Sequence, residues 1–187
     1  MKLSHPWSIF GLSVATGAIV VVVASGVSAW QRRQALPAHE LTPGVAISEQ
    51  LQPQAMALAR RSFSTVIDMR PDGEAAGQPR SGDMAAAANA QHLQFAYVPV
   101  PHGDIPDAVV DSLAREMASR PGPVLLYCRS GRRAARSWSL VEASRPGGMN
   151  VDEILAAVKA SGQDASDLRA KIEHRVQARK PTAGTTA

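Results

Sequence analysis

The chain contains a single cysteine, and this scarcity limits its chemistry. Cys128 is alone among 187 residues, so no disulfide can form within the chain and no cysteine-based zinc cluster is possible. The five histidines show none of the spacing that is typical of metal ligands. We therefore expect no metal site, and no feature of the sequence implies an organic cofactor.

Aromatic residues and net charge are also low. Phenylalanine, tryptophan and tyrosine together make up 4% of the chain, and the formal net charge is +4. Nucleic-acid binding needs a strongly basic face with aromatic side chains for stacking. The composition therefore argues against a nucleic-acid partner.

The first feature that is present is a long uncharged run near the start. No residue from Trp7 to Trp30 is charged, and Arg32 and Arg33 follow the run. About 20 apolar residues cross a bilayer as a helix, and tryptophan is common at both interfaces. We predict that residues 1–33 are a single-pass membrane anchor. A cleaved signal peptide is the alternative, and the sequence leaves open which side of the membrane the rest of the chain faces.

The remainder of the chain alternates between strand and helix patterns. We predict a linker at residues 34–44, one α/β domain at residues 45–178 and a disordered tail at 179–187. The domain is expected to be a three-layer sandwich around a mainly parallel sheet. Its most apolar strand, residues 121–128, should be central, because a strand buried on both faces reads as a continuous apolar run. The other predicted strands are residues 45–47, 64–70 and 95–100.

Cys128 lies between that apolar strand and a predicted helix. Open α/β folds place their sites at such junctions, where loop amides and the helix N-terminus attract anions. Arginines crowd the same stretch and favour a thiolate at the cysteine. We predict a reactive Cys128 inside an anion-binding loop made of Arg129, Ser130, Gly131 and Arg132.

The length of this loop distinguishes two chemistries. Counted from Cys128, Arg133 closes a six-residue C-x4-R loop, and Ala134 follows it. Tyrosine and dual-specificity phosphatases use a seven-residue C-x5-R loop, commonly with a hydroxyl just after the arginine. Rhodanese-type sulfurtransferases use six residues, since a smaller ring of amides suits a terminal sulfur better than a tetrahedral phosphate. The loop length therefore favours sulfur transfer.

Polar residues at the end of strand 64–70 are expected to support the loop. Asp68 and Arg70 would lie close to it if the two strands are neighbours. We predict that Asp68 accepts hydrogen bonds from loop amides or pairs with Arg133. Glu74, a few residues further on, is predicted to be solvated.

The segment PVPHGDIPD supplies a candidate acid. Asp104 follows strand 95–100, roughly where a dual-specificity phosphatase carries the general acid that protonates the leaving oxygen. A sulfurtransferase has no need of this group. The neighbouring His102 is interpreted as an ordinary loop residue.

Three stretches together, VIDMRPDGEAAGQP, YVPVPHGDI and PVLLYCRSGRRA, resemble a bacterial family. The family is described both as sulfur transferases and as phosphatase-like, and is often associated with beta-lactamase-like hydrolases of persulfide metabolism. The resemblance runs from about Val45 to Arg175. It implies a dual-specificity-phosphatase fold with Cys128 as nucleophile and Arg133 as anion clamp. The chain departs from the family pattern at Arg132 and Ala134, where threonine and serine are typical.

Three functions follow from these observations. The main prediction is a membrane-tethered, rhodanese-like sulfurtransferase, which takes sulfur from thiosulfate or a persulfide onto Cys128 and passes it to a thiol or cyanide. The alternative is a phosphatase that acts through phosphocysteine with Asp104 as general acid. The third is a membrane-held module that senses oxidation or anions through Cys128.

Overall fold

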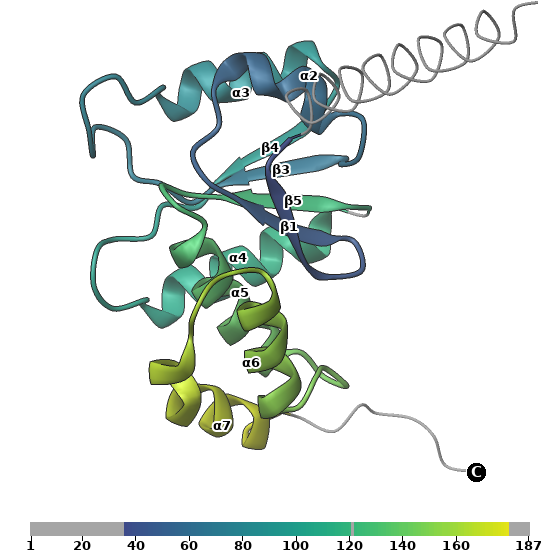
Figure 1. Cartoon of the computed structure of the whole chain (residues 1–187), viewed down its shortest axis with the longest axis vertical. Helices are drawn as coiled ribbons and strands as arrows, with labels where there is room; N and C mark the ends of the chain where they lie inside the picture. Colours follow the sequence, from purple (N-terminus) through teal and green to yellow (C-terminus); the bar gives the residue numbers. More distant parts are fainter. Residues whose placement is uncertain (1–35, 121, 180–187) are drawn as a thin grey trace, which may run out of the picture. The chain divides into compact units, whose positions relative to one another are not determined.

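Five short strands form one sheet in the computed structural model, which describes residues 36–120 and 122–179 (Figure 1). The order across the sheet is β1-β2-β5-β3-β4, and only the β1–β2 pair is antiparallel in these residues. The strands are β1 (Ala38–Thr42), β2 (Val45–Ser48), β3 (Thr65–Asp68), β4 (Gln94–Tyr97) and β5 (Val124–Tyr127). The sheet is therefore mainly parallel, as predicted.

β5 occupies the centre of the sheet because its sequence, VLLY, is apolar on both faces. All four residues are buried, and the strand pairs in parallel with β2 on one side and β3 on the other. This confirms the predicted central strand. The carboxyl ends of β2, β3 and β5 consequently meet at one edge, where Cys128 follows β5.

Helices cover both faces of the sheet and form two hydrophobic cores (Figure 1). One core lies under α2 and α3, and the other lies against α4 and α5, with α6 and α7 packed on α5. This arrangement agrees with the predicted layers. The helices are α2 (Met56–Ala59), α3 (Ser81–Ala90), α4 (Asp107–Ser119), α5 (Arg132–Ser144), α6 (Val151–Ala160) and α7 (Arg169–Gln177); short 3-10 turns at Pro53–Ala55 and Ser166–Leu168 precede α2 and α7.

The predicted linker at residues 34–44 is corrected by β1. Residues 38–42 pair with β2 across a tight turn in which Gly44 has a φ of 83°. This left-handed conformation suits glycine, and a proline at the preceding position is typical of such turns. The sequence analysis missed β1 because it is a short edge strand with exposed charged and polar side chains. Its alternation of apolar and polar residues is therefore weak.

The predicted carboxyl-terminal boundary of the domain also differs from the structure, and the predicted anchor and most of the predicted tail lie outside the described residues. Arg179, which we assigned to the tail, donates hydrogen bonds to backbone carbonyls near the end of α5. Within the described residues, no helix has both the length and the apolarity needed to cross a bilayer. The predicted anchor at residues 1–33 and the tail beyond Arg179 lie outside these residues.

Candidate active site

Cys128 stands at the junction between β5 and α5, as the sequence predicts. Its side chain is 1% exposed and belongs to the core on the α5 side of the sheet. Gly131 ends the connecting loop with a φ of 81° and caps α5. A Cβ at that position would meet Gln163 Nε2 at 3.3 Å and Ile47 Cδ1 at 3.4 Å. Glycine is therefore needed both for the left-handed turn and for the close packing.

The backbone of the loop is held by two glutamines. The Gln50 backbone N–H donates to the Arg129 carbonyl at 3.3 Å, and Gln163 Nε2 donates to the Ser130 carbonyl at 3.1 Å. No side chain caps the N-terminus of α5, so the first amides of this helix remain available. The loop carbonyls are therefore occupied by hydrogen bonds, whereas the first amides of α5 have no side-chain cap. This arrangement suits an anion at the helix N-terminus.

Arg133 is held in place by Glu74, which the sequence analysis wrongly placed in solvent. Arg133 Nη2 donates to Glu74 Oε2 at 2.8 Å, and Nη1 donates to the Val100 carbonyl at 2.8 Å. The Glu74 side chain is only 9% exposed. Burial alone would raise the pKa of Glu74, but hydrogen bonds from Arg133 and Arg70 outweigh it and lower the pKa to about 2. Glu74 is therefore ionised and orients Arg133.

Arg70 connects the same carboxylate to the loop. Its Nε donates to Glu74 Oε2 at 2.7 Å, and its Nη1 donates to Gln50 Oε1 at 2.9 Å. Gln50 in turn holds the loop carbonyl described above. The predicted supporting position of Arg70 agrees with these contacts. Sequence reasoning missed Glu74, Gln50 and Gln163, because neither their spacing nor their residue type marks them.

Asp68 does not contact the loop, which corrects the prediction that it binds loop amides or Arg133. It is the in-register partner of Tyr127, whose ring lies in the α2–α3 core, whereas Cys128 lies in the opposite core. Its Oδ1 accepts from the Arg70 amide at 2.9 Å. Burial raises the pKa of Asp68 to about 6, and burial together with Asp68 raises the pKa of Tyr127. Successive residues of a strand face opposite sides, which explains the separation.

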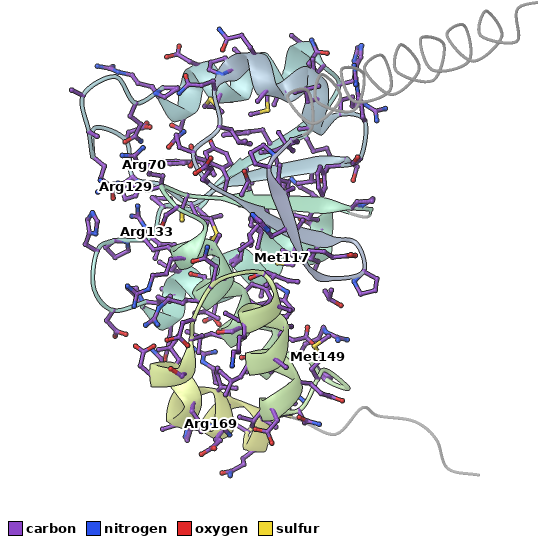
Figure 2. All side chains as sticks on the ribbon, viewed as in Figure 1. Arg70, Met117, Arg129, Arg133, Met149 and Arg169 are labelled. Carbon is purple, nitrogen blue, oxygen red and sulfur yellow. The ribbon has the colours of Figure 1, made fainter. Side chains whose placement is uncertain are left out.

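A hollow of about 580 Å³ opens at this edge of the sheet. Figure 2 shows Arg70, Arg129 and Arg133 at the same edge, where the strands end. The hollow brings together the predicted loop residues and the loop that follows β4, and no carboxylate is among its described lining residues. It is lined by His102, Gly103, Arg129, Ser130, Arg132, Arg133 and Arg136.

His102 lies in the hollow and Asp104 does not. Asp104 is 82% exposed, and its carboxylate lies 3.5 Å from Lys171 Nζ. The His102 side chain is 71% exposed, with Nε2 lying 2.8 Å from Glu74 Oε1. Arg133 Nη1 also lies 2.8 Å from this oxygen, although neither contact is aligned as a hydrogen bond. The structure thus places His102, which we interpreted as an ordinary loop residue, in the lining of the hollow, and the predicted acid outside that lining.

No metal site accompanies these residues in the part of the chain that the structure describes. There, no three histidine, cysteine, aspartate or glutamate side chains gather as ligands. The arrangement instead combines a buried thiol, open helix amides and several guanidinium groups. This is the setting for a nucleophile acting on an anion.

The family model and the curated relatives point to the same family of proteins. The family model for the phosphatase-like domain of beta-lactamase hydrolase-like proteins matches residues 38–145. A beta-lactamase hydrolase-like protein of Xylella fastidiosa is 38% identical over 57% of this chain, which spans about a quarter (24%) of that relative.

Solved structures with the same fold carry phosphatase descriptions. A Neisseria meningitidis protein described as a candidate phosphatase matches with a TM-score of 0.65 and 27% identity, covering 75% of this chain and 99% of the other. P. aeruginosa TpbA with a cysteine-to-serine change, in complex with phosphotyrosine, matches with a TM-score of 0.52 and 17% identity, covering 76% and 91%. The second match shows the fold alone.

These matches do not support the predicted sulfurtransferase, and the phosphatase alternative fits them better. The prediction relied on the six-residue loop. Loop length limits how many amides can point at an anion, but it does not decide which anion they bind, because side chains around the loop also contribute charge.

Proposed function

This chain belongs to the phosphatase-like domain family of the beta-lactamase hydrolase-like proteins, and on that premise we propose that it is a cysteine-dependent phosphatase. The observation that carries the proposal is that Cys128 begins and Arg133 closes one loop at the N-terminus of α5, with Arg133 held by the nearly buried Glu74. A guanidinium held at the end of the loop that the thiol begins can orient a phosphate ester and stabilise the charge that develops during transfer.

The reaction has two steps. The Cys128 thiolate attacks phosphorus, so that a sulfur–phosphorus bond forms while the bond to the leaving oxygen breaks and that oxygen takes a proton. Water then attacks the phosphocysteine, the sulfur–phosphorus bond breaks, and inorganic phosphate leaves with the thiolate restored. Only some of the five N–H donors of Arg133 bond to Glu74 and the Val100 carbonyl. The others can bond to phosphate oxygens.

The leaving oxygen needs a proton donor, and the loop between β4 and α4 supplies two candidates, His102 and Asp104. His102 lines the hollow and contacts Glu74, whereas Asp104 points to Lys171. We assign proton delivery to His102. Asp104, predicted from its position in the sequence, is the competing candidate, since a loop of this kind can close when substrate binds.

The test uses the purified full chain with p-nitrophenyl phosphate. We expect phosphate release by the wild type and none by Cys128→Ser. A phosphate adduct on Cys128 should appear in the intact mass after rapid acid quenching. Circular dichroism and thermal unfolding of the variant should match the wild type, which separates lost chemistry from lost folding.

A parallel reaction with thiosulfate and cyanide distinguishes the sulfurtransferase. Thiocyanate formation without phosphate release would overturn the proposal in favour of sulfur transfer. Phosphate release that survives in Cys128→Ser would also overturn it, because the nucleophile would then lie elsewhere.

A further inference from the structure

The hollow carries more positive charge than its carboxylate contacts neutralise. Four arginines line it, and two of them are engaged: Arg133 by Glu74, and Arg136 by both carboxylate oxygens of Asp167. Arg129 and Arg132 make no ion pair or side-chain hydrogen bond within residues 36–120 and 122–179. Both are exposed, so their guanidinium groups can reach a ligand.

Arg132 interacts electrostatically with two carboxylates that it does not contact. It helps to lower the pKa of Asp164 and Asp167, although these shifts come mainly from hydrogen bonds with Ser166 and Arg136 respectively. Neither carboxylate lies within ion-pair distance of Arg132, so its donors are not occupied by them. An arginine that has free donors beside a hollow is suited to bind a carboxylate or a phosphate in a bidentate manner.

The geometry of the loop gives Arg133, the inner arginine, a different role from Arg129 and Arg132, the outer arginines. Where loop amides surround an anion, the side chains of the same residues must project away from it. Arg129 and Arg132 therefore reach the part of the substrate that lies outside the amide ring, whereas Arg133 remains with the group that is transferred. A substrate with only one phosphate would leave both outer arginines without a partner.

The residues other than arginine that line the hollow limit the class of substrate. Gly103, Ser130 and His102 complete it, so among the described residues no phenylalanine, tyrosine or tryptophan is available to stack on a phosphotyrosine ring. The volume of about 580 Å³ is within the range of about 300–1,000 Å³ that is usual for small-molecule sites.

We propose that the substrate is a small molecule with at least two phosphate groups, a diphosphate or a bisphosphate. One phosphate is transferred to Cys128, and the second is held by Arg129 and Arg132. This inference rests on the proposed phosphatase function for its first phosphate, but the second anion site can be tested without turnover.

The binding experiment uses the full-length Cys128→Ser variant with orthophosphate and pyrophosphate as probes, measured by calorimetry. We expect pyrophosphate to bind at least about 10-fold more tightly, as one bidentate charged contact can provide. Adding Arg129→Gln and Arg132→Gln together should remove this preference. Arg169→Gln, which changes an exposed arginine on α7 away from the loop (Figure 2), is the matched control and should retain it.

The outcomes separate the two proposals. Equal affinity for the two probes, or a preference that survives the double substitution, would overturn the second anion site even if aryl phosphates are hydrolysed. A preference that the double substitution removes supports the site even if no phosphate ester is turned over, and in that case only the proposed function fails. Tighter binding of a phosphotyrosine peptide than of pyrophosphate would also overturn the inference.

In the active enzyme, the matching result is a change in relative specificity. The double substitution should reduce kcat/KM for a bisphosphate at least about 10-fold more than kcat/KM for p-nitrophenyl phosphate, which has no second anion. Equal losses for both substrates would show that the two arginines act only on the transferred group.

Discussion

Glu74 shows how one carboxylate can organise the charges around the cysteine loop. It contacts Arg70, Arg133 and His102, which come from two other segments of the chain as well as its own. Because it is nearly buried and ionised, it places the guanidinium groups while leaving the hollow itself positive. Its contacts with Arg133 support the role of a positioning residue for that guanidinium.

Glu74→Gln should lower kcat/KM for an aryl phosphate about 10–100-fold, the effect of losing one charge-assisted hydrogen bond. Little further loss is expected when Glu74→Gln is added to Arg133→Ala, because both changes remove the same interaction. Additive losses would contradict this positioning role. Glu173→Gln, at an exposed glutamate of α7, is the control.

The same variant should change acid stability. The pKa of Glu74 falls from its ordinary 4.5 to about 2 in the folded chain. Its stabilisation is therefore present above pH 4.5 and is lost as pH falls from 4.5 to about 2. In urea unfolding, the difference between wild type and Glu74→Gln should shrink over this range, and a constant difference would disagree with it.

The proton donor can be identified by comparing leaving groups. His102→Gln should reduce kcat/KM much more for an alkyl phosphate than for p-nitrophenyl phosphate, because the poor leaving group depends on protonation. A selective loss of about 100-fold or more is expected, and Asp104→Asn should show less. If Asp104→Asn shows the larger selective loss, the loop closes on substrate and Asp104 is the acid.

Asp68 is a carboxylate whose charge is costly in the folded chain. Burial raises its pKa from 3.8 to about 6, so the folded state favours the protonated form, and stability is lost as pH rises from 3.8 to about 6, with the full cost above that. Asp68→Asn keeps an acceptor for the Arg70 amide. We expect the variant to gain about 1–3 kcal/mol relative to wild type at pH 8 compared with pH 4. Urea unfolding at both pH values measures this, and an unchanged difference would contradict it.

At the scale of elements, β5, the cysteine loop and α5 form one unit whose far end is secured by Arg179. This side chain donates to carbonyls at the end of α5 and in the turn before α6, and Glu142 contributes a carboxylate that binds Arg145 and the Met149 amide. The four accepting carbonyls are those of Glu142, Ala143, Gly148 and Met149. The last turn of α5 therefore depends on a residue far along the chain.

Arg179→Ala should destabilise the fold by about 1–3 kcal/mol, because it leaves carbonyl groups at a helix end without donors. Arg169→Ala, which removes an exposed pair with Asp152, should change stability much less. Chemical denaturation measures both. Equal effects would mean that water replaces the Arg179 contacts without cost.

At the scale of the whole molecule, residues 36–179 supply the sheet, both cores and every residue placed at the site. A fragment of these residues should unfold cooperatively and hydrolyse p-nitrophenyl phosphate with a kcat/KM within about threefold of the full chain. A fragment that folds but is inactive would show that residues outside it contribute to catalysis. Ending the fragment at residue 178 should lower its stability, as Arg179→Ala does.

Local patterns were sufficient to predict much of this fold. The apolar run of residues 121–128 predicted a central strand, which β5 confirms. Cys128 and its arginines marked the site, because strand, loop and helix N-terminus are adjacent in the chain. Such features depend on residues a few positions apart, which a sequence displays directly.

The charge partners and the facing of side chains depended on the tertiary structure. Glu74 reaches Arg133 across 59 positions, and Asp68 lies on the wrong side of the sheet for the role that its strand position suggested. His102 rather than Asp104 faces the hollow. Each of these outcomes depends on how the sheet is ordered and how the loops close over its edge. Sequence spacing carries no information about either, because an ion pair forms between groups that folding brings together, however far apart they are in the chain.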